Sequence, residues 1–175
     1  MQVIPTANSA QLTFFLRGQI DAAWAPEPWA ARLVRDAGAR ILVDERTLWP
    51  GGEFTSTEVI ASPKFLKEHP DLVKAFLRTH VALTEWIGRN PAEAKQVINL
   101  QLRKEMGKPL APGVLDDAFS RVRATYDPLP ATLLRSADHA FEEGFLGRTK
   151  PDLSNLYDLT LLNEVLRERK ARPVQ

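Results

Sequence analysis

Short apolar runs alternate with runs of helical period over residues 1–44. Three of the runs are apolar and too short for helices, as is typical of strands: residues 2–5, 20–24 and 40–43. Between them apolar residues recur every three or four positions, and Gly18 and Gly38 follow these two runs as helix C-caps would. This β-α-β-α-β order with short connections predicts a parallel sheet.

The pattern changes after a Pro-Gly-Gly break at residues 50–52. Residues 55–61 (TSTEVIA) alternate and are rich in β-branched side chains, which predicts a fourth strand. Beyond residue 63 the period is helical, and residues 90–93 (NPAE) combine an N-cap, a proline at N1 and a glutamate at N3. We expect helices that begin near residues 70, 91, 113, 131 and 154 and end near residues 89, 107, 125, 143 and 170.

The predicted fold class is therefore α/β, with a short, mostly parallel sheet followed by a helical C-terminal part. A sheet of three or four strands is thin for a doubly wound fold, whose sheets are larger and covered on both faces. The chain thus looks like the later part of something larger.

Composition narrows the function classes. The 175 residues carry a net charge of +1, which gives no reason to expect nucleic acid or a membrane surface as partner. The absence of cysteine excludes disulfides, thiolate metal sites and a cysteine nucleophile. The three histidines have no further ligand at metal-binding spacing, and no glycine-rich phosphate loop occurs, so we expect neither a metal nor a cofactor. No apolar run is long enough for a membrane span, and the N-terminus does not resemble a signal peptide.

Several spaced motifs resemble the substrate-binding proteins of the nitrate, sulfonate, taurine and bicarbonate class of bacterial ABC importers. The most specific is GQIDAAWAPEPWAARLV at residues 18–34, followed by ARILVDE at residues 39–45. Residues 65–94 (FLKEHPDLVKAFLRTHVALTEWIGRNPAEA) are similar to a long helix of that family and the helix start that follows it. ATYDPLPATLLRSADHAFEEGFL at residues 124–146 and DLSNLYDLTLLNEVL at residues 152–166 resemble its C-terminal helices. These motifs are specific as to family and not as to ligand.

The resemblance implies an incomplete periplasmic binding protein type II-like fold, of which the chain holds the C-terminal half. Residues 1–61 would form a partial α/β lobe with a return hinge strand at about 54–61, and residues 62–175 would belong to the other lobe. The implied function is non-enzymatic: the complete protein binds a small-molecule solute in the periplasm and delivers it to the membrane permease of an ABC importer. As written, without a signal peptide, the chain would stay in the cytoplasm.

The missing segments lead to two further expectations. One wall of the cleft and the hinge that closes it would be absent, so we expect the chain alone to bind solute at millimolar level or not at all. Apolar sheet faces would be uncovered, so we expect a homodimer or larger assembly.

The stretch APEPW at residues 25–29 lies where the second expected strand ends. Ligands in open α/β sheets bind at the carboxyl ends of strands. One interpretation places Glu27 in the cleft, where it orients the ligand, with Trp24 or Trp29 as a flat wall. A carboxylate repels an anion, so Glu27 would then meet an amine, a hydroxyl or a nearby cation. The other interpretation places Glu27 in the first turn of a helix, where a carboxylate favours the macrodipole, and both tryptophans in the core.

Three hydroxyl residues complete the candidate ligand set. Ser9 begins a helix whose free N–H groups suit an anionic head group, and a simple N-cap is the alternative. Thr55 and Thr57 lie where the crossing strand should pass the cleft, and a solvent-facing strand is the alternative there. The candidate ligand-binding residues are therefore Glu27, Trp29, Thr55, Thr57 and Ser9, with no catalytic residue.

Two other function classes fit parts of the pattern. The same fold serves a thiamine-pyrimidine synthase family of enzymes, which depends on a cysteine-rich motif that this chain lacks. A helical adaptor or regulator would use residues 63–170 as its working part and the short sheet as a platform. The sequence leaves the identity of the ligand open, and also whether the chain is a natural fragment or has a wrongly assigned start codon.

Overall fold

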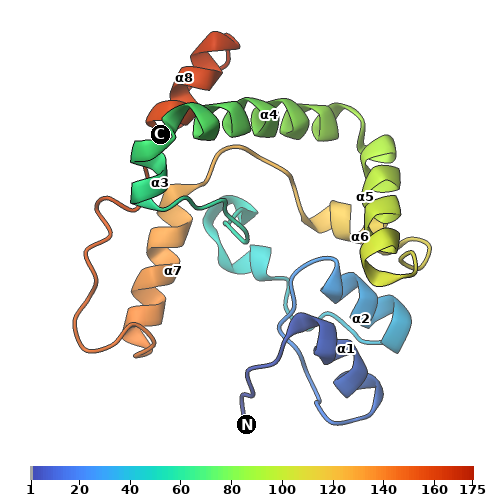
Figure 1. Ribbon diagram of the computed structural model, residues 1–175. Coiled ribbons are helices and arrows are strands. Elements are labelled where there is room, and N and C mark those ends of the chain that lie inside the picture. Colours follow the sequence, from blue (N-terminus) through green and yellow to red (C-terminus); the bar gives the residue numbers. More distant parts are fainter. Residues whose placement is uncertain (1) are drawn as a thin grey trace. The chain divides into compact units, whose positions relative to one another are not determined.

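Figure 1 shows a computed structural model of the chain, which describes residues 2–175 except for the side chain of Met106. The described part holds eight α-helices and two short 3-10 helices: α1 (Asn8–Leu16), α2 (Trp29–Ala37), η1 (Glu45–Leu48), η2 (Pro50–Gly52), α3 (Pro63–Glu68), α4 (Pro70–Arg89), α5 (Pro91–Met106), α6 (Val114–Arg121), α7 (Pro130–Glu142) and α8 (Thr160–Glu168). None of these helices is long and apolar enough to cross a membrane.

The predicted sheet is missing. Residues 2–175 contain no β-strand, so the prediction of an α/β fold with a parallel sheet is wrong. The four segments expected as strands are irregular chain, and Ile4, Leu42 and Ile60 within them are 56%, 84% and 91% exposed. A strand makes its backbone hydrogen bonds to neighbouring strands, whereas a helix makes them within itself. In the described part of the chain no strand lies beside these short segments, so they have no strand partner for their backbone hydrogen bonds. The helical runs need no such partner, and they form helices.

The helix ends follow the sequence signals closely. The starts expected from the proline signals coincide with the first residues of α4 and α5. Gly18 and Gly38 have φ of +65° and +68°, and these left-handed residues end α1 and α2. Such a conformation is strained for residues with a Cβ, so the two glycines are the reason the helices stop there.

Two expected helices are shorter than their apolar patterns. Helix α6 ends at Arg121 because the next residue, Val122, has an extended backbone with φ −119° and ψ 138°. Helix α8 begins at Thr160, because the side chains of Asp152 and Asp158 each accept the backbone N–H two residues on. These local turns compete with helical hydrogen bonding in the preceding segment.

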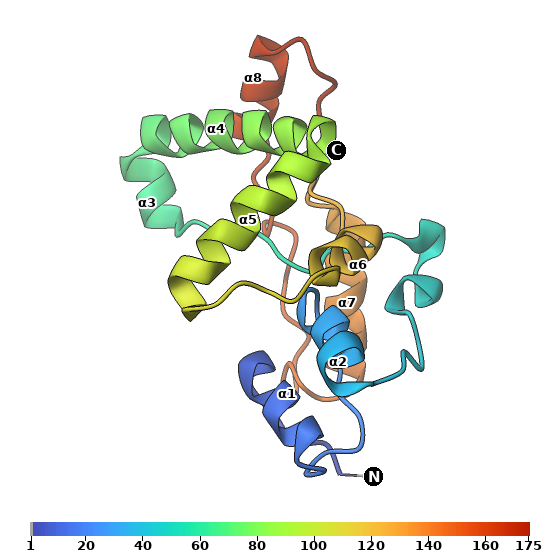
Figure 2. The same cartoon turned by 90° about the vertical axis from the view of Figure 1, so that its right-hand side faces the viewer.

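The chain forms two compact units, which we describe one at a time. The first consists of Met1–Glu45 and Ile87–Ala124. Within it α1 lies beside α2, and α2 packs on α6 (Figures 1 and 2). Ala31 of α2 is fully buried against Leu110, Val114 and Ala118. Two alanines at this contact allow the helix backbones to approach closely.

The second unit consists of Arg46–Trp86 and Thr125–Gln175. Its core lies where α8 packs on α4, and Val81 is fully buried there against Leu162, Val165 and Leu166. Ion pairs surround this apolar contact, formed by Lys74 with Glu164 and Glu168, by Arg78 with Glu168, and by Arg169 with Glu85. Helix α8 is thus held by a small apolar core with a charged rim.

Candidate functional site

Glu27 lies two residues before the first residue of α2, within the APEPW stretch. Its Oε2 accepts the backbone N–H of Ala31 at 3.0 Å, and its Oε1 accepts the Nε–H of Arg121 at 2.5 Å. The Glu27 side chain is only 8% exposed and that of Arg121 20%. Glu27 thus lies before the first turn of α2 and not in it, where the helix-start interpretation expected it, although its carboxylate accepts an N–H of that turn. The same carboxylate also meets a nearby cation, Arg121.

A second arginine–carboxylate pair joins the same two helices. Arg35, near the end of α2, donates from Nε and Nη2 to the two carboxylate oxygens of Asp117 on α6, at 2.5 and 2.9 Å. The hydrogen bond from the Arg35 guanidinium lowers the pKa of Asp117 below its usual value. Since Glu27 precedes α2 and Arg121 ends α6, the two pairs bracket the buried Ala31 contact. They fix the register of α2 on α6 and the place of the turn.

The two tryptophans of this turn have different surroundings. Trp29 is half-buried, and the guanidinium carbon of Arg32 lies 4.8 Å from its ring centroid. Trp24 is 83% exposed, and its Nε1–H donates to Glu45 Oε2 at 2.8 Å. Trp24 is thus not a core residue, and it presents an aromatic face to solvent.

Ser9 lies in the first turn of α1, and it is exposed. The buried polar residue of that helix is Gln11, which is 8% exposed and whose Nε2 donates to the carbonyl oxygen of Trp24 at 3.4 Å. Gln11 thereby ties α1 to the turn that contains Glu27. Within the first unit, the structure brings the α1 start and the APEPW turn together through Gln11 rather than through a bond of Ser9.

Thr55 and Thr57 belong to the second unit. The Thr55 hydroxyl donates to the carbonyl oxygen of Pro128 at 2.6 Å, and its backbone N–H donates to Thr132 Oγ1 at 3.0 Å. Thr57 is exposed. These bonds fasten residue 55 to the start of α7, and they use the hydroxyl hydrogen of Thr55 within the protein.

The comparison with protein families gives one match. The model of the NMT1-like family matches residues 1–102 of this chain, which is more than half of its length. The chain belongs to the NMT1-like family. This confirms the resemblance to substrate-binding proteins of the nitrate, sulfonate and taurine class of ABC transporters. The comparisons with curated proteins and with solved structures found no match.

The match places this NMT1-like chain among solute-binding proteins of the ABC transporter type, a family made up mostly of binding proteins. The matched residues include all five predicted ligand residues, together with Gln11. Whether the five residues contact a ligand stays a prediction. So does the assignment of residues 1–61 and 62–175 to separate lobes with a hinge at about 54–61.

Sequence reasoning missed two residues at the turn, Gln11 and Arg121. Gln11 lies beside the apolar positions of α1, and a polar residue there is not expected to be buried. Arg121 lies 94 positions after Glu27 in the chain, and no local pattern links the two. The only available signal was chemical, because a carboxylate between two prolines and beside an indole suggests a cation nearby.

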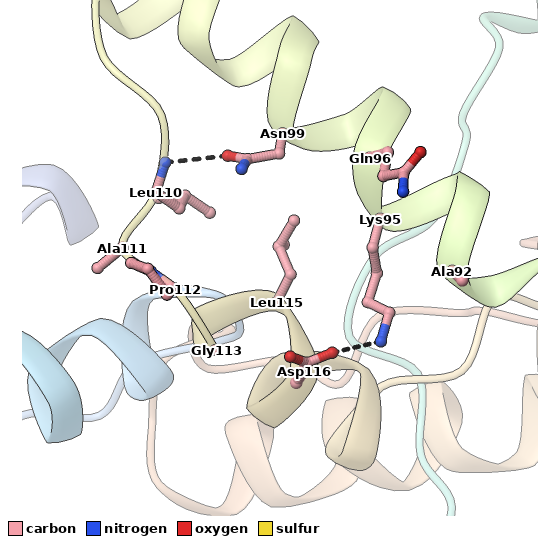
Figure 3. Close-up of a pocket in the computed structure, with 10 residues that line it drawn as sticks. All are labelled: Ala92, Lys95, Gln96, Asn99, Leu110, Ala111, Pro112, Gly113, Leu115 and Asp116. Carbon is pink, nitrogen blue, oxygen red and sulfur yellow. Dashed lines mark hydrogen bonds and ion pairs between the residues drawn. The ribbon is translucent and has the colours of Figure 1, made fainter.

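The first unit of the NMT1-like chain also has a shallow pocket of ≈ 320 Å³, formed between α5, α6 and the loop that joins them (Figure 3). Lys95 and Asp116 form an ion pair on one side of it, and Asn99 Oδ1 accepts the backbone N–H of Leu110 at 2.9 Å on another. Each of these polar groups therefore already has a partner within the protein, on the other element that lines the pocket. The predicted ligand residues are not among those that line it.

The histidines make aromatic contacts. His69 lies 5.0 Å from Phe65 between ring centroids, His80 stacks on Phe76 at 5.9 Å, and His139 lies 6.4 Å from Trp49. Across the described residues, no group of three metal-binding side chains is arranged to hold an ion. The expectation of no metal and no cofactor stays a prediction.

Proposed function

We propose that this NMT1-like chain binds a small solute with an anionic group, such as an aliphatic sulfonate, nitrate or taurine, for delivery to the membrane permease of an ABC importer. The family match over residues 1–102 carries this proposal. The pairing of Glu27 with Arg121 supports it, because the carboxylate of the turn is neutralised by a cation and no longer repels an anion. No turnover is expected, and the working compartment would be the periplasm.

We also propose that the 175 residues are part of a larger receptor and self-associate when isolated. The support is the exposure of apolar residues in segments whose pattern is typical of strands, with Leu42 and Ile60 as the clearest cases. Further protein packed against these segments would bury such side chains. In isolation, exposed apolar surface of this kind recruits a second copy.

The test is a calorimetric titration of the chain, and of a version extended by the upstream coding sequence, with taurine, ethanesulfonate and nitrate. We expect the 175-residue chain to bind one of them in the millimolar range and the extended version to bind it at micromolar level or better. Failure of both proteins across the panel would overturn the solute-binding proposal. Tight, saturable binding by the 175-residue chain alone would overturn the proposal that it is part of a larger receptor.

A further inference from the structure

Residues 40–43 (RILV), between α2 and η1, combine exposed apolar side chains with an unpaired backbone. Ile41, Leu42 and Val43 are 49%, 84% and 62% exposed. In the described part of the chain, residues 40–43 make no hydrogen bond through backbone or side chain. Exposed β-branched side chains on a segment with unpaired N–H and C=O groups form a template to which a further strand adds. This segment is therefore suited to strand pairing with a partner.

The order of charges around this segment fits a second copy of the same segment. Arg40 and Asp44 stand two positions before and after Leu42, with only apolar residues between them. When two copies are laid antiparallel with Leu42 opposite Leu42, each Arg40 comes opposite the partner's Asp44. Each Ile41 then comes opposite the partner's Val43. Every position thus faces a residue of opposite charge or of apolar character, and cross-strand pairs of both kinds stabilise a sheet.

Other arrangements of the same two segments fit less well. A parallel pair in register places the two Arg40 guanidiniums opposite each other, and likewise the two Asp44 carboxylates, and like charges directly opposite are destabilising. An antiparallel pair shifted by one residue places Asp44 opposite Ile41 in one direction, and Arg40 opposite Val43 in the other. Either shift leaves a charge facing an apolar side chain. The charges therefore specify one direction and one register.

The other strand-like segments lack this self-complementarity. Residues 2–5 carry no charge, and residues 20–24 and 55–61 each carry a single acidic residue. Pairing either of these two with its own copy would bring two acids together without a basic residue to offset them. In residues 55–61 the acid is Glu58, which already accepts the hydroxyl hydrogen of Tyr157 at 2.6 Å. Among the four segments, residues 40–44 are therefore the one suited to a second copy.

We propose that two copies of this chain pair through residues 40–44 as an antiparallel two-stranded ribbon, with Leu42 opposite Leu42 and Arg40 opposite the partner's Asp44. The ribbon rests on the self-association put forward as part of the proposed function, and it assigns an interface to that association. The pairing is closed, because both copies use the same residues about a two-fold axis. Asp44 has an interaction within its own chain, and a carboxylate accepts several hydrogen bonds, so the new ion pair adds to that interaction or replaces it.

The pairing is weak, for two physical reasons. The chain bends at Leu42, so the segment loses conformational freedom when it straightens to pair. A ribbon of two short strands is only marginally stable without further packing. The dimer therefore exchanges with the monomer at micromolar concentration, and the dissociation constant is the quantity to measure.

The first experiment exchanges the charges of the ribbon in the 175-residue chain. Arg40→Asp places two carboxylates opposite each other at both ends of the ribbon, and Asp44→Arg places two guanidiniums there. We expect each variant to raise the dissociation constant of the homodimer about tenfold or more in analytical ultracentrifugation. An equimolar mixture of the two variants should associate within about threefold of the unmodified chain, because every cross-strand pair then joins an acid to a base again. The chain with both changes should do the same.

Two control variants make the same changes of net charge elsewhere. Arg17→Asp and Asp21→Arg lie at exposed positions of the first unit. We expect them to leave the dissociation constant within about twofold. Equal weakening by the control variants, or a mixture that does not recover, would overturn the ribbon and leave the proposed self-association in place. An unmodified chain that is monomeric at micromolar concentration would overturn both.

The second experiment measures the register by cross-linking and decides even if a charge variant does not fold. The chain has no cysteine, so Leu42→Cys introduces a single thiol. Residues directly opposite in an antiparallel pair have Cα atoms about 4.5–5.5 Å apart, which suits a disulfide, whereas two copies of residue 41 would lie diagonally at about 7–8 Å. With oxidised glutathione as the oxidant, we expect Leu42→Cys to form a linked dimer about fivefold or more faster than Ile41→Cys. Equal rates, or a faster reaction of Ile41→Cys, would overturn the ribbon.

Discussion

Arg78 of α4 and Glu168 of α8 form a two-pronged ion pair, in which Nε and Nη2 donate to the two carboxylate oxygens at 2.9 and 3.1 Å. Lys74, one turn earlier on α4, contacts the same carboxylate at 3.0 Å. Hydrogen bonds from Arg78 and then Lys74 lower the pKa of Glu168 to about 2. The contact of α8 with α4 therefore depends on an ionised carboxylate.

This contact should respond to acid. The pKa of Glu168 is lowered from 4.5 to about 2 on folding, so its contribution to stability is complete above 4.5 and is lost as the pH falls towards 2. We expect Glu168→Gln to lower the melting temperature at pH 6 and to have a much smaller effect near pH 2. Circular dichroism melts of both proteins over this range provide the measurement. Glu143→Gln, at an exposed position after α7, is the control. A difference that does not change with pH would contradict the prediction.

The pair of Glu27 and Arg121 should matter more for stability, because both side chains are largely buried. Glu27→Ala leaves a buried guanidinium without its counter-charge and removes the acceptor of the Ala31 N–H. We expect a loss of about 2–4 kcal/mol in the free energy of unfolding, measured by urea denaturation. In a double-mutant cycle with Arg121→Ala the two losses should not add.

A control on the same helix separates this effect from general sensitivity of α2. Asp36→Asn breaks the Arg32–Asp36 pair, a contact of 3.4 Å between neighbours four residues apart. We expect it to cost less than about 0.5 kcal/mol. Equal losses for Glu27→Ala and Asp36→Asn would refute the assignment of a special role to the turn.

The sequence predicted helices well and the sheet badly, and the difference has a physical cause. The starts of α4 and α5 and the glycine ends of α1 and α2 are set by residues within a few positions of the boundary. Strand formation depends on partners that are distant in the sequence. A strand-like pattern around Leu42 or Ile60 therefore shows a local preference for extended backbone, but it does not determine whether a sheet forms. The same limit applies to the site. Glu27 is conspicuous in its local sequence, but its partner Arg121 is 94 positions away, and no sequence pattern links the two.

The contact of α2 with α6 should not tolerate a larger side chain. Ala31 is fully buried, with 0% of its surface exposed, in the cluster that contains Val114 and Ala118. We expect Ala31→Leu to force the helices apart and cost about 1–3 kcal/mol, measured by urea unfolding. The same change at Ala75, on an exposed face of α4, should cost almost nothing. A wild-type midpoint for Ala31→Leu would show that the helices are not in close contact.

Thr55 and Thr57 should separate structure from binding. Thr55→Val removes the donor to the Pro128 carbonyl and leaves that oxygen without the bond, which should cost about 1–2 kcal/mol of stability. Thr57 is exposed, so Thr57→Val should change stability by less than about 0.5 kcal/mol. If Thr57 donates to the solute as predicted, its variant weakens binding at unchanged melting temperature. Unchanged affinity in a folded Thr57→Val protein would remove this residue from the ligand set.

Self-association should depend on the exposed apolar residues of the strand-like segments. Leu42 is 84% exposed, and burial of a leucine side chain against a second copy is worth about 1.5–3 kcal/mol, a large share of a weak association energy. A lysine at this position is well solvated in the monomer, and association would have to remove water from its charge. We therefore expect Leu42→Lys to shift the molar mass measured by light scattering towards that of the monomer, at unchanged helix content. Leu33→Lys, at a 6% exposed position of α2, should instead unfold the first unit. An unmodified protein that is monomeric at micromolar concentration would contradict the proposed association, and association that persists in Leu42→Lys would place the interface elsewhere.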